Sequence, residues 1–186
     1  MAELMALTAL GAREAAVVTA GPITITERID VALASVAARR GRMAGLAKAA
    51  QAAGVPLPEA ARHQAGEPFS AFWVAPEMWF VEAPFASHEG IAEVLKSTLG
   101  DDASVTEQTD AWVAFDLAGP DLARLFERLC NVDYPAAPAG YATRTVIEHL
   151  GCYLVLRDPE AVRLYGPRSS AGSLLHALEV AAAAAW

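Results

Sequence analysis

The order strand, helix, hairpin, helix occurs twice along this chain of 186 residues, and this repeat restricts the fold more than any other feature of the sequence. Apolar residues alternate or recur every three to four positions in the predicted elements. The first half is expected to contain a strand, a helix, two hairpin strands and a second helix, at residues 31–37, 42–53, 69–74, 78–82 and 87–99. Ser87 is placed to cap that second helix, whose predicted apolar face is Ile91, Val94, Leu95 and Leu99.

The second half repeats this order and adds a strand. A strand is expected at residues 111–117, and Pro120 suits the first position of the helix that follows. Three further strands are expected at 143–149, 152–157 and 161–165, before a last helix capped by Ser169 or Ser170. The apolar faces predicted for the two helices are Leu122, Leu125, Phe126 and Leu129, and Leu174, Leu175 and Leu178.

These patterns predict an α+β fold in which antiparallel sheets are covered by helices. The expected division is an N-terminal arm at residues 1–22, a first half at 23–102 and a second half at 103–186, all in one compact unit. The halves share a pattern rather than a sequence. A length of 186 residues suits such a unit.

Composition narrows the classes of partner. The formal net charge of −8 disfavours nucleic acid, which needs clustered Lys and Arg. No apolar run reaches the ~18–20 residues of a membrane helix, and Glu3, Arg13 and Glu14 make the N-terminus a poor signal peptide. Cys130 and Cys152 form no disulfide framework. We therefore expect a cytoplasmic protein, and a hydrophobic content of 54% indicates a surface that meets a partner.

No motif with a known catalytic mechanism is present. The sequence contains neither a Gly-x-Gly-x-x-Gly turn nor a Walker loop. Its four histidines, at positions 63, 88, 149 and 176, have no metal-ligand spacing with one another or with the cysteines. We therefore predict no catalytic, cofactor-binding or metal-binding residue on this chain.

Two groups of arginines leave alternatives open. Arg39, Arg40 and Arg42 precede a predicted helix, where they could bind an anion such as polyglutamyl folate, or could form a solvated turn or meet an acidic partner. A second group lies on or near the last three strands and could pair with a partner's carboxylates, or could line a solvated face: Arg157, Arg163 and Arg168.

The tryptophans indicate more about packing than the arginines do. Phe72 and Trp73 are adjacent on a predicted strand and therefore face opposite ways. Trp73, Trp79 and Trp112 can belong to the core or anchor an interface. Trp186, the last residue given, is expected to be either frayed or docked.

Four segments together resemble the gamma subunit of heterotetrameric sarcosine oxidase. They are FWVAPEMWFVEAP (72–84), SVTEQTDAWVAFDLAGPDLARLFERLCNVDYP (104–135), GYATRTVIEHLGCYLVL (140–156) and VRLYGPRSSAGSLLHAL (162–178). Their order and spacing match from about Ile23 onward, including the Gly-Pro before one helix and the Arg-Ser-Ser before the last.

The resemblance implies a non-catalytic role in an enzyme of four different subunits, alpha to delta. That enzyme oxidatively demethylates sarcosine to glycine, forms hydrogen peroxide, and passes the one-carbon unit to tetrahydrofolate when it is present, as methylenetetrahydrofolate. FAD, FMN, NAD and zinc are expected on the other subunits. This chain would pack chiefly against alpha.

The family is similar in turn to the first part of folate-dependent aminomethyltransferases such as the T-protein of glycine cleavage. Those enzymes carry an aspartate in an Asp-x-Ser segment before the strand that corresponds to residues 111–119. Here Glu107 and Asp110 are the nearest carboxylates, and neither matches cleanly. Two alternative functions follow: a stand-alone folate-binding or aminomethyl-transfer protein, and an interaction module unrelated to sarcosine.

Overall fold

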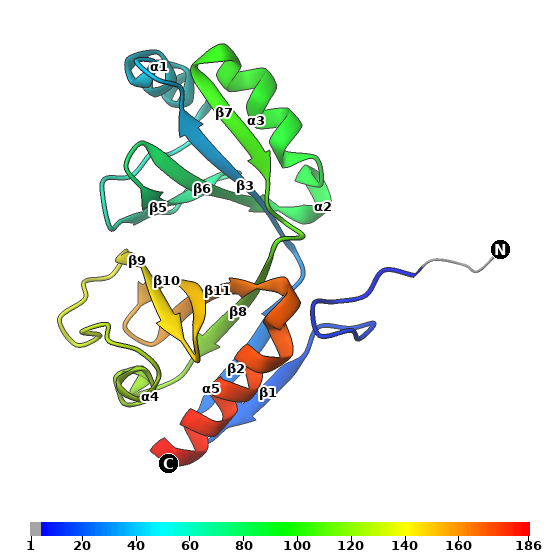
Figure 1. Cartoon of the computed structure of the whole chain (residues 1–186), viewed down its shortest axis with the longest axis vertical. Coiled ribbons are helices and arrows are strands. Elements are labelled where there is room, and N and C mark those ends of the chain that lie inside the picture. The colour runs from blue at the N-terminus through cyan, green and yellow to red at the C-terminus, as the bar shows by residue number, and fades with distance from the viewer. Residues whose placement is uncertain (1–4) are drawn as a thin grey trace.

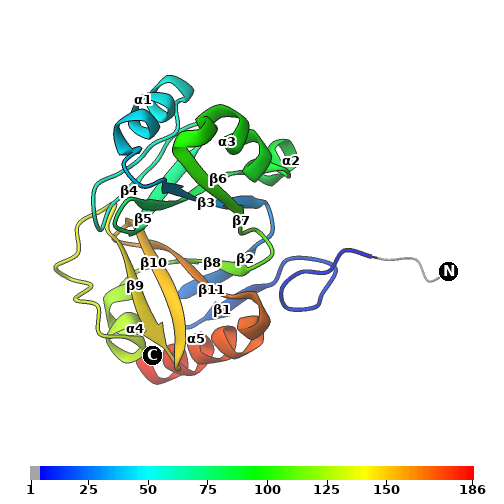
Figure 2. The same cartoon turned by 45° about the horizontal axis from the view of Figure 1, so that its top comes forward.

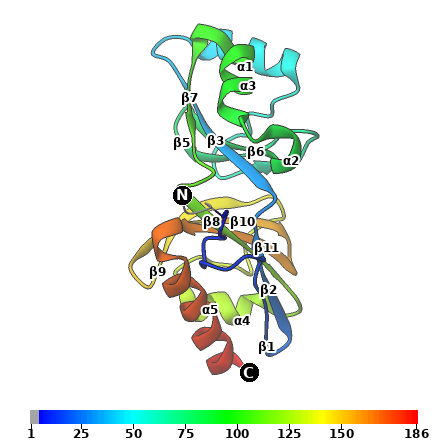
Figure 3. The same ribbon diagram turned by 90° about the vertical axis from the view of Figure 1, so that its right-hand side faces the viewer.

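Two antiparallel sheets pack face to face, and helices cover the outer side of each, in a computed structural model that describes residues 5–186 (Figures 1 and 3). The α+β class with helix-covered antiparallel sheets is therefore confirmed. The six-stranded sheet has the order β1 (Val17–Ala20), β2 (Ile23–Arg28), β8 (Trp112–Ala118), β11 (Ala161–Pro167), β10 (Leu150–Asp158) and β9 (Ala142–Ile147). The five-stranded sheet has the order β4 (His63–Gln64), β5 (Ser70–Ala75), β6 (Met78–Pro84), β3 (Val31–Ala38) and β7 (Ala103–Glu107).

The helices lie in two outer layers. α4 (Leu122–Leu129) and α5 (Ala171–Ala185) cover the six-stranded sheet. α1 (Met43–Ala53) and α3 (Ile91–Leu99) cover the five-stranded sheet, with the short α2 (Phe85–His88) following β6. Among the predicted inward residues, those of α4 and α5 are buried or half-buried, whereas Val94 of α3 is 41% exposed.

The predicted capping serines do not cap. Ser87 lies inside α2, where its hydroxyl donates to the Pro84 carbonyl, and α3 begins only after Gly90. Ser170 precedes α5 but makes no side-chain capping bond. The sequence pattern located both helices and the N-cap position of α5, but it placed the start of α3 too early.

Sheet membership differs from the expected division into halves. β2, placed in the first half at 23–102, pairs with β8 in the six-stranded sheet. β7, placed in the second half at 103–186, pairs with β3 in the five-stranded sheet. The chain thus changes sheets twice, after β2 and after β7 (Figure 1). Ile23 and Ile25 of β2 are fully buried in the core under α4 and α5, which explains why β2 belongs to the six-stranded sheet.

The turn between β9 and β10 lies two residues earlier than predicted. β9 ends at Ile147 and β10 begins at Leu150. Glu148 and His149, expected within a strand, have φ angles of 46° and 69° and form the turn. Two residues with positive φ match the right-handed twist of a hairpin.

The layer between the sheets is aromatic at its centre. Phe72 and Phe80 of the five-stranded sheet meet Tyr153 and Tyr165 of the six-stranded sheet, with ring centroids 5.3 to 5.9 Å apart. The start of β4 also lies beside the loop before β9 (Figure 2). There the His63 amide donates to Gly140 O at 2.7 Å, and the Ala142 amide donates to Ala61 O at 3.0 Å. The two sheets are therefore joined by packing and by backbone hydrogen bonds.

The expected arm at residues 1–22 falls partly outside the described residues, since positions 1–4 are not among them. Its last part is strand β1, which pairs with β2 at the edge of the six-stranded sheet. At the other end of the chain, Trp186 packs near Gly21, and its ring lies 5.8 Å from the guanidinium of Arg124. The C-terminal residue is therefore docked.

Candidate functional site

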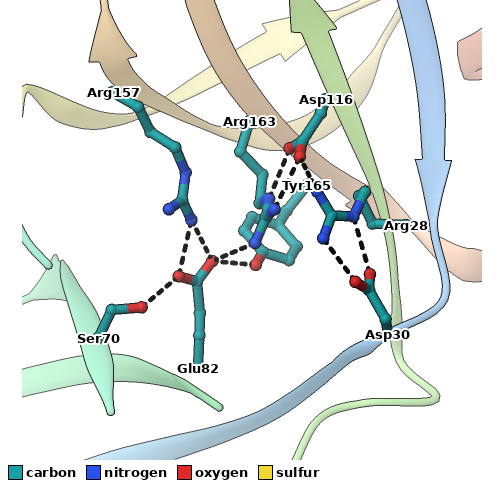
Figure 4. A network of polar contacts seen from close by, with 8 residues as sticks. All are labelled: Arg28, Asp30, Ser70, Glu82, Asp116, Arg157, Arg163 and Tyr165. Carbon is teal, nitrogen blue, oxygen red and sulfur yellow. Dashed lines mark hydrogen bonds and ion pairs between the residues drawn. The ribbon is translucent and has the colours of Figure 1, made fainter. Parts of the chain in front are cut away.

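The main polar feature of the molecule is a carboxylate buried between the sheets. Glu82 of β6 is 3% exposed and points across the layer toward β11 and β10 (Figure 4). Tyr165 of β11 donates its hydroxyl to Glu82, and Arg163 lies 3.4 Å from the same carboxylate oxygen. Arg157 of β10 donates to both oxygens, at 2.8 and 3.0 Å. Ser70 of β5 donates at 2.6 Å, so the carboxylate is fully hydrogen-bonded.

A second carboxylate continues the network toward the edge of the layer. Arg163 donates from Nε and Nη2 to Asp116 of β8, at 2.6 and 2.8 Å. Asp116 also accepts from Arg28 of β2 at 2.7 Å, and Arg28 makes a two-bond pair with the exposed Asp30. Three arginines thus alternate with three carboxylates in one chain of contacts (Figure 4).

The surroundings keep Glu82 ionised. Burial alone would raise the pKa of its carboxyl group, but Arg157 and Arg163, with hydrogen bonds from Ser70 and Tyr165, lower that pKa to about 2. Burial, and then the charge of Glu82, raise the pKa of Tyr165 well above its ordinary value. Tyr165 is therefore a hydrogen-bond donor rather than a base at neutral pH.

His63 of β4 lies beside this network. Burial, followed by the charge of Arg157, lowers the pKa of its imidazole to about 4, against a smaller opposing effect of Glu82. Its Nε2 atom and the Nε atom of Arg157 are both buried and have no hydrogen-bond partner among residues 5–186. The imidazole is thus neutral at pH 7, so one of its ring nitrogens carries a proton and the other can accept a hydrogen bond.

A cavity of about 920 Å³ opens onto one side of the network. Its walls include Arg28, Glu82, Arg157 and Arg163, and the loop of residues 66–68. Each of these charged groups already has a partner of opposite charge within the chain. The arrangement is typical of a structural ion network that fixes two sheets to each other, because the hydroxyls of Ser70 and Tyr165 donate to a carboxylate that two arginines already pair, which makes it a weak base.

A second cavity, of about 510 Å³, lies where the arm meets the crossover between the sheets. We call it the arm cavity. Its lining is mainly apolar, with Leu7, Ile29, Phe85 and Trp112 among its members, and also includes the charged residues Arg13, Glu27, Arg28, Asp110 and Arg168. Trp112 is half-buried and donates from Nε1 to Gln108 at 3.1 Å.

Glu107 and Asp110, the carboxylates nearest the Asp-x-Ser position of the aminomethyltransferases, have different environments. Glu107 turns back on its own loop and accepts from the Thr109 amide at 2.9 Å and from the Thr109 hydroxyl at 2.5 Å. Thr109 in turn accepts from the Leu33 amide at 2.9 Å, so Glu107 secures the β7–β8 crossover. Asp110 is 92% exposed at the rim of the arm cavity, 3.7 Å from Arg168.

The arginine cluster before α1 meets the chain's own acidic residues. Arg39 lies 3.9 Å from Asp101, and Arg42 lies 3.8 Å from Asp102. All three arginines of this cluster are exposed, as the solvated-turn alternative predicts. Arg157 and Arg163 fit neither alternative weighed for them, because their partners Glu82 and Asp116 belong to this chain.

Of the tryptophans, Trp79 belongs to the core. It is 5% exposed, and its Nε1 donates to Pro58 O at 2.8 Å. Phe72 and Trp73 face opposite ways as predicted: Phe72 lies between the sheets and Trp73 packs toward the helices. Trp112 lies in the aromatic layer, 5.2 Å from Tyr153.

The remaining candidate groups do not converge. His88 accepts or donates a 2.9 Å bond with Ser87, and His176 is exposed on α5. Cys152 is buried, and burial raises the pKa of its thiol to about 11. No cluster of three or more potential ligands that could hold a metal occurs within the described part of the chain. No helix among residues 5–186 is both long and apolar enough to cross a membrane.

Sequence reasoning did not find Glu82 or Asp116. Each is the lone charged residue of an otherwise apolar strand, and a lone acidic residue in a strand is normally assigned to the solvent face. The available signal was Glu82 itself, because it interrupts an otherwise apolar strand between Val81 and Ala83. A charge in such a position needs a buried counter-charge, and Arg163 was the candidate on another strand.

Comparison with known proteins rests on structure alone. No protein-family model matches the sequence, and a search of curated proteins finds no match. The structure is similar to a chain of heterotetrameric sarcosine oxidase from Corynebacterium sp. U-96, solved in complex with pyrrole 2-carboxylate. The TM-score is 0.76 at 21% identity, over 90% of this chain and 87% of that one.

It is also similar to the glycine cleavage system aminomethyltransferase T from Bartonella henselae, with a TM-score of 0.57 at 13% identity. That match covers 82% of this chain and 44% of the aminomethyltransferase, so the chain spans less than half of that enzyme. The chain therefore has the fold of one component of heterotetrameric sarcosine oxidase, a fold shared with part of the aminomethyltransferases.

Proposed function

We propose that this chain is the non-catalytic gamma subunit of a heterotetrameric sarcosine oxidase. The observation that carries the proposal is the structural similarity to a chain of such an enzyme, which extends over nearly the whole of both chains. The site geometry supports it, because the charges of Glu82, Asp116, Arg157 and Arg163 are paired with one another and hold the two sheets together.

In this role the chain stabilises the assembly. The network around Glu82 and the aromatic layer join the two sheets, so the chain offers a preformed surface to its neighbours. Its partners would be the alpha, beta and delta subunits, chiefly alpha, in the cytoplasm. FAD, FMN, NAD and zinc would be held by those subunits, where sarcosine is oxidised to glycine with formation of hydrogen peroxide. Tetrahydrofolate would accept the one-carbon unit as methylenetetrahydrofolate.

Co-expression of the four subunits of the host enzyme, with and without this chain, tests the proposal. With it, we expect a stable flavin-containing complex that oxidises sarcosine. Without it, we expect loss of the complex or a steep drop in its yield. A complete, fully active enzyme formed in the absence of this chain would contradict the role.

One observation favours a second function, a stand-alone folate-binding or aminomethyl-transfer protein. The arm cavity combines an indole ring, Trp112, with the exposed carboxylate of Asp110, and the fold is shared with an aminomethyltransferase. Calorimetric titration of tetrahydrofolate into the isolated chain decides between the two. The subunit role predicts no heat of binding, whereas saturable binding would favour the second function.

A further inference from the structure

Exposed apolar side chains gather around the arm cavity. Leu7 on the arm is 50% exposed, and Ile29 in the link between β2 and β3 is 52% exposed; both line the cavity. Met5, two residues before Leu7, is 56% exposed. Large apolar side chains exposed together at a cavity mark a surface that loses water when a partner binds.

The interior of the cavity suits an inserted side chain. Phe85, Trp112 and Val31 contribute to its walls, and its volume is about 510 Å³. The arm forms one side of it: in Figures 1 and 3 the dark-blue arm lies beside β2, next to the crossover between the sheets. An apolar anchor buried in such a pocket is the usual centre of an interface hot spot.

The arm is held in place before any partner arrives. Glu27 is 2% exposed and accepts from the amides of Leu10 and Ala16, at 3.2 and 3.1 Å. Arg168 donates to the Leu7 carbonyl at 3.0 Å. Because these bonds already fix the backbone around Leu7, docking there costs little ordering entropy.

The charge at the rim selects the partner. Arg13 lines the cavity, is exposed, and forms no ion pair within residues 5–186. The chain as a whole has a formal net charge of −8. The cavity itself is lined by three arginines, Arg13, Arg28 and Arg168, and by two carboxylates, Glu27 and Asp110. A carboxylate on a partner is therefore disfavoured over the surface as a whole and favoured next to Arg13.

We propose that the arm cavity and its rim, with Leu7, Ile29 and Arg13 as the main contacts, form the docking site for another subunit of the complex. The occupant is a segment of that subunit that inserts an apolar side chain and brings a carboxylate to Arg13. This assignment rests on the proposed function, because it takes the partner to be a subunit of the sarcosine oxidase assembly.

Matched variants of the co-expressed complex test the site. Leu7→Asp and Ile29→Asp should each reduce the fraction of this chain that co-elutes with the flavin-containing subunits about tenfold or more. The controls are Val146→Asp and Val180→Asp, whose side chains are 59% and 53% exposed on β9 and α5, away from the arm cavity. They should leave that fraction within about twofold of the wild type. Melting curves of the isolated variants check that each chain folds.

The charge is tested separately. Arg13→Glu should reduce co-elution about tenfold at low salt and less at high salt. Arg40→Glu, an exposed arginine with no ion pair in the described chain, is the control and should have little effect. A photo-crosslinker at position 7 of the intact complex should label another subunit, and one at position 146 should not.

The outcomes separate this inference from the proposed function. If the wild-type chain joins no flavin-containing complex, the proposed function fails, and the docking site with it. If the wild type joins and the Leu7, Ile29 and Arg13 variants join equally well, only the docking site is refuted. If the variants assemble normally, and if the chain binds tetrahydrofolate and Leu7→Asp abolishes that binding, the arm cavity is a ligand pocket. This result would also refute docking.

Discussion

Glu82→Gln is the most informative substitution, because it removes one charge from the layer between the sheets and keeps the size of the side chain. The pKa of Glu82 is about 2 in the folded chain against an ordinary value of 4.5. This difference corresponds to about 3 kcal/mol of stability at neutral pH. Breaking a buried pair by removing one partner costs a similar amount, about 3–5 kcal/mol. We therefore expect Glu82→Gln to lower the free energy of unfolding by about 3 kcal/mol at pH 7.

The sign of the pH dependence follows from the lowered pKa. Ionised Glu82 contributes fully above about pH 4.5, and that contribution is lost as the pH falls toward 2. Urea unfolding of the wild type between pH 7 and pH 3 should show this loss, and Glu82→Gln should lack that part of it. Glu59→Gln, at an exposed position, is the matched control.

A loss below about 1 kcal/mol for Glu82→Gln, or an acid dependence identical to that of the wild type, would refute the reasoning. Either result would mean that the network around Glu82 does not hold the sheets together. The aromatic layer of Phe72, Phe80 and Tyr153 would then carry the contact, together with the backbone hydrogen bonds between the two sheets.

Other positions give further tests of the fold. Phe126→Ala should cost about 3–5 kcal/mol in urea unfolding, because the ring is fully buried and stacks on Tyr134 at 5.2 Å; a near-neutral midpoint would contradict the packing of α4. Gly119→Ala should lower the melting temperature, since its φ is +143° and a Cβ would lie 2.6 Å from the Pro22 carbonyl oxygen. Gly172→Ala, in open space on α5, should instead raise the melting temperature, because alanine stabilises a helix by up to about 1 kcal/mol relative to glycine. His63→Gln should remove the part of the stability loss that occurs as the pH falls from 6.5 to 4, since the imidazole resists protonation in the folded chain; an unchanged pH profile would contradict its burial.

Most helices and seven of the strands could be predicted because each depends on local periodicity, whereas no strand was expected at the positions of β1, β2, β4 and β7. The face of α4 with Leu122, Leu125 and Phe126 is the clearest case: all three are fully buried at the spacing expected of an amphipathic helix. The hairpin of β5 and β6 likewise follows from two alternating runs around Pro76 and Glu77.

What periodicity cannot supply is the pairing between distant strands. The alternation of β2 shows that one face is buried, but not that the partner is β8, about ninety positions later. The same holds for the ion network, because Glu82, Arg157 and Arg163 lie on three strands of two sheets. Their convergence depends on which faces of the sheets meet, and this is a property of the tertiary fold.

The most direct test of the central claim is to purify this chain with an affinity tag from its native host and to examine what accompanies it. The subunit masses, the absorption spectrum and sarcosine-dependent hydrogen peroxide formation would be recorded on the same sample. The account predicts a yellow complex of four different chains that oxidises sarcosine. A colourless, soluble chain recovered alone would contradict the subunit role.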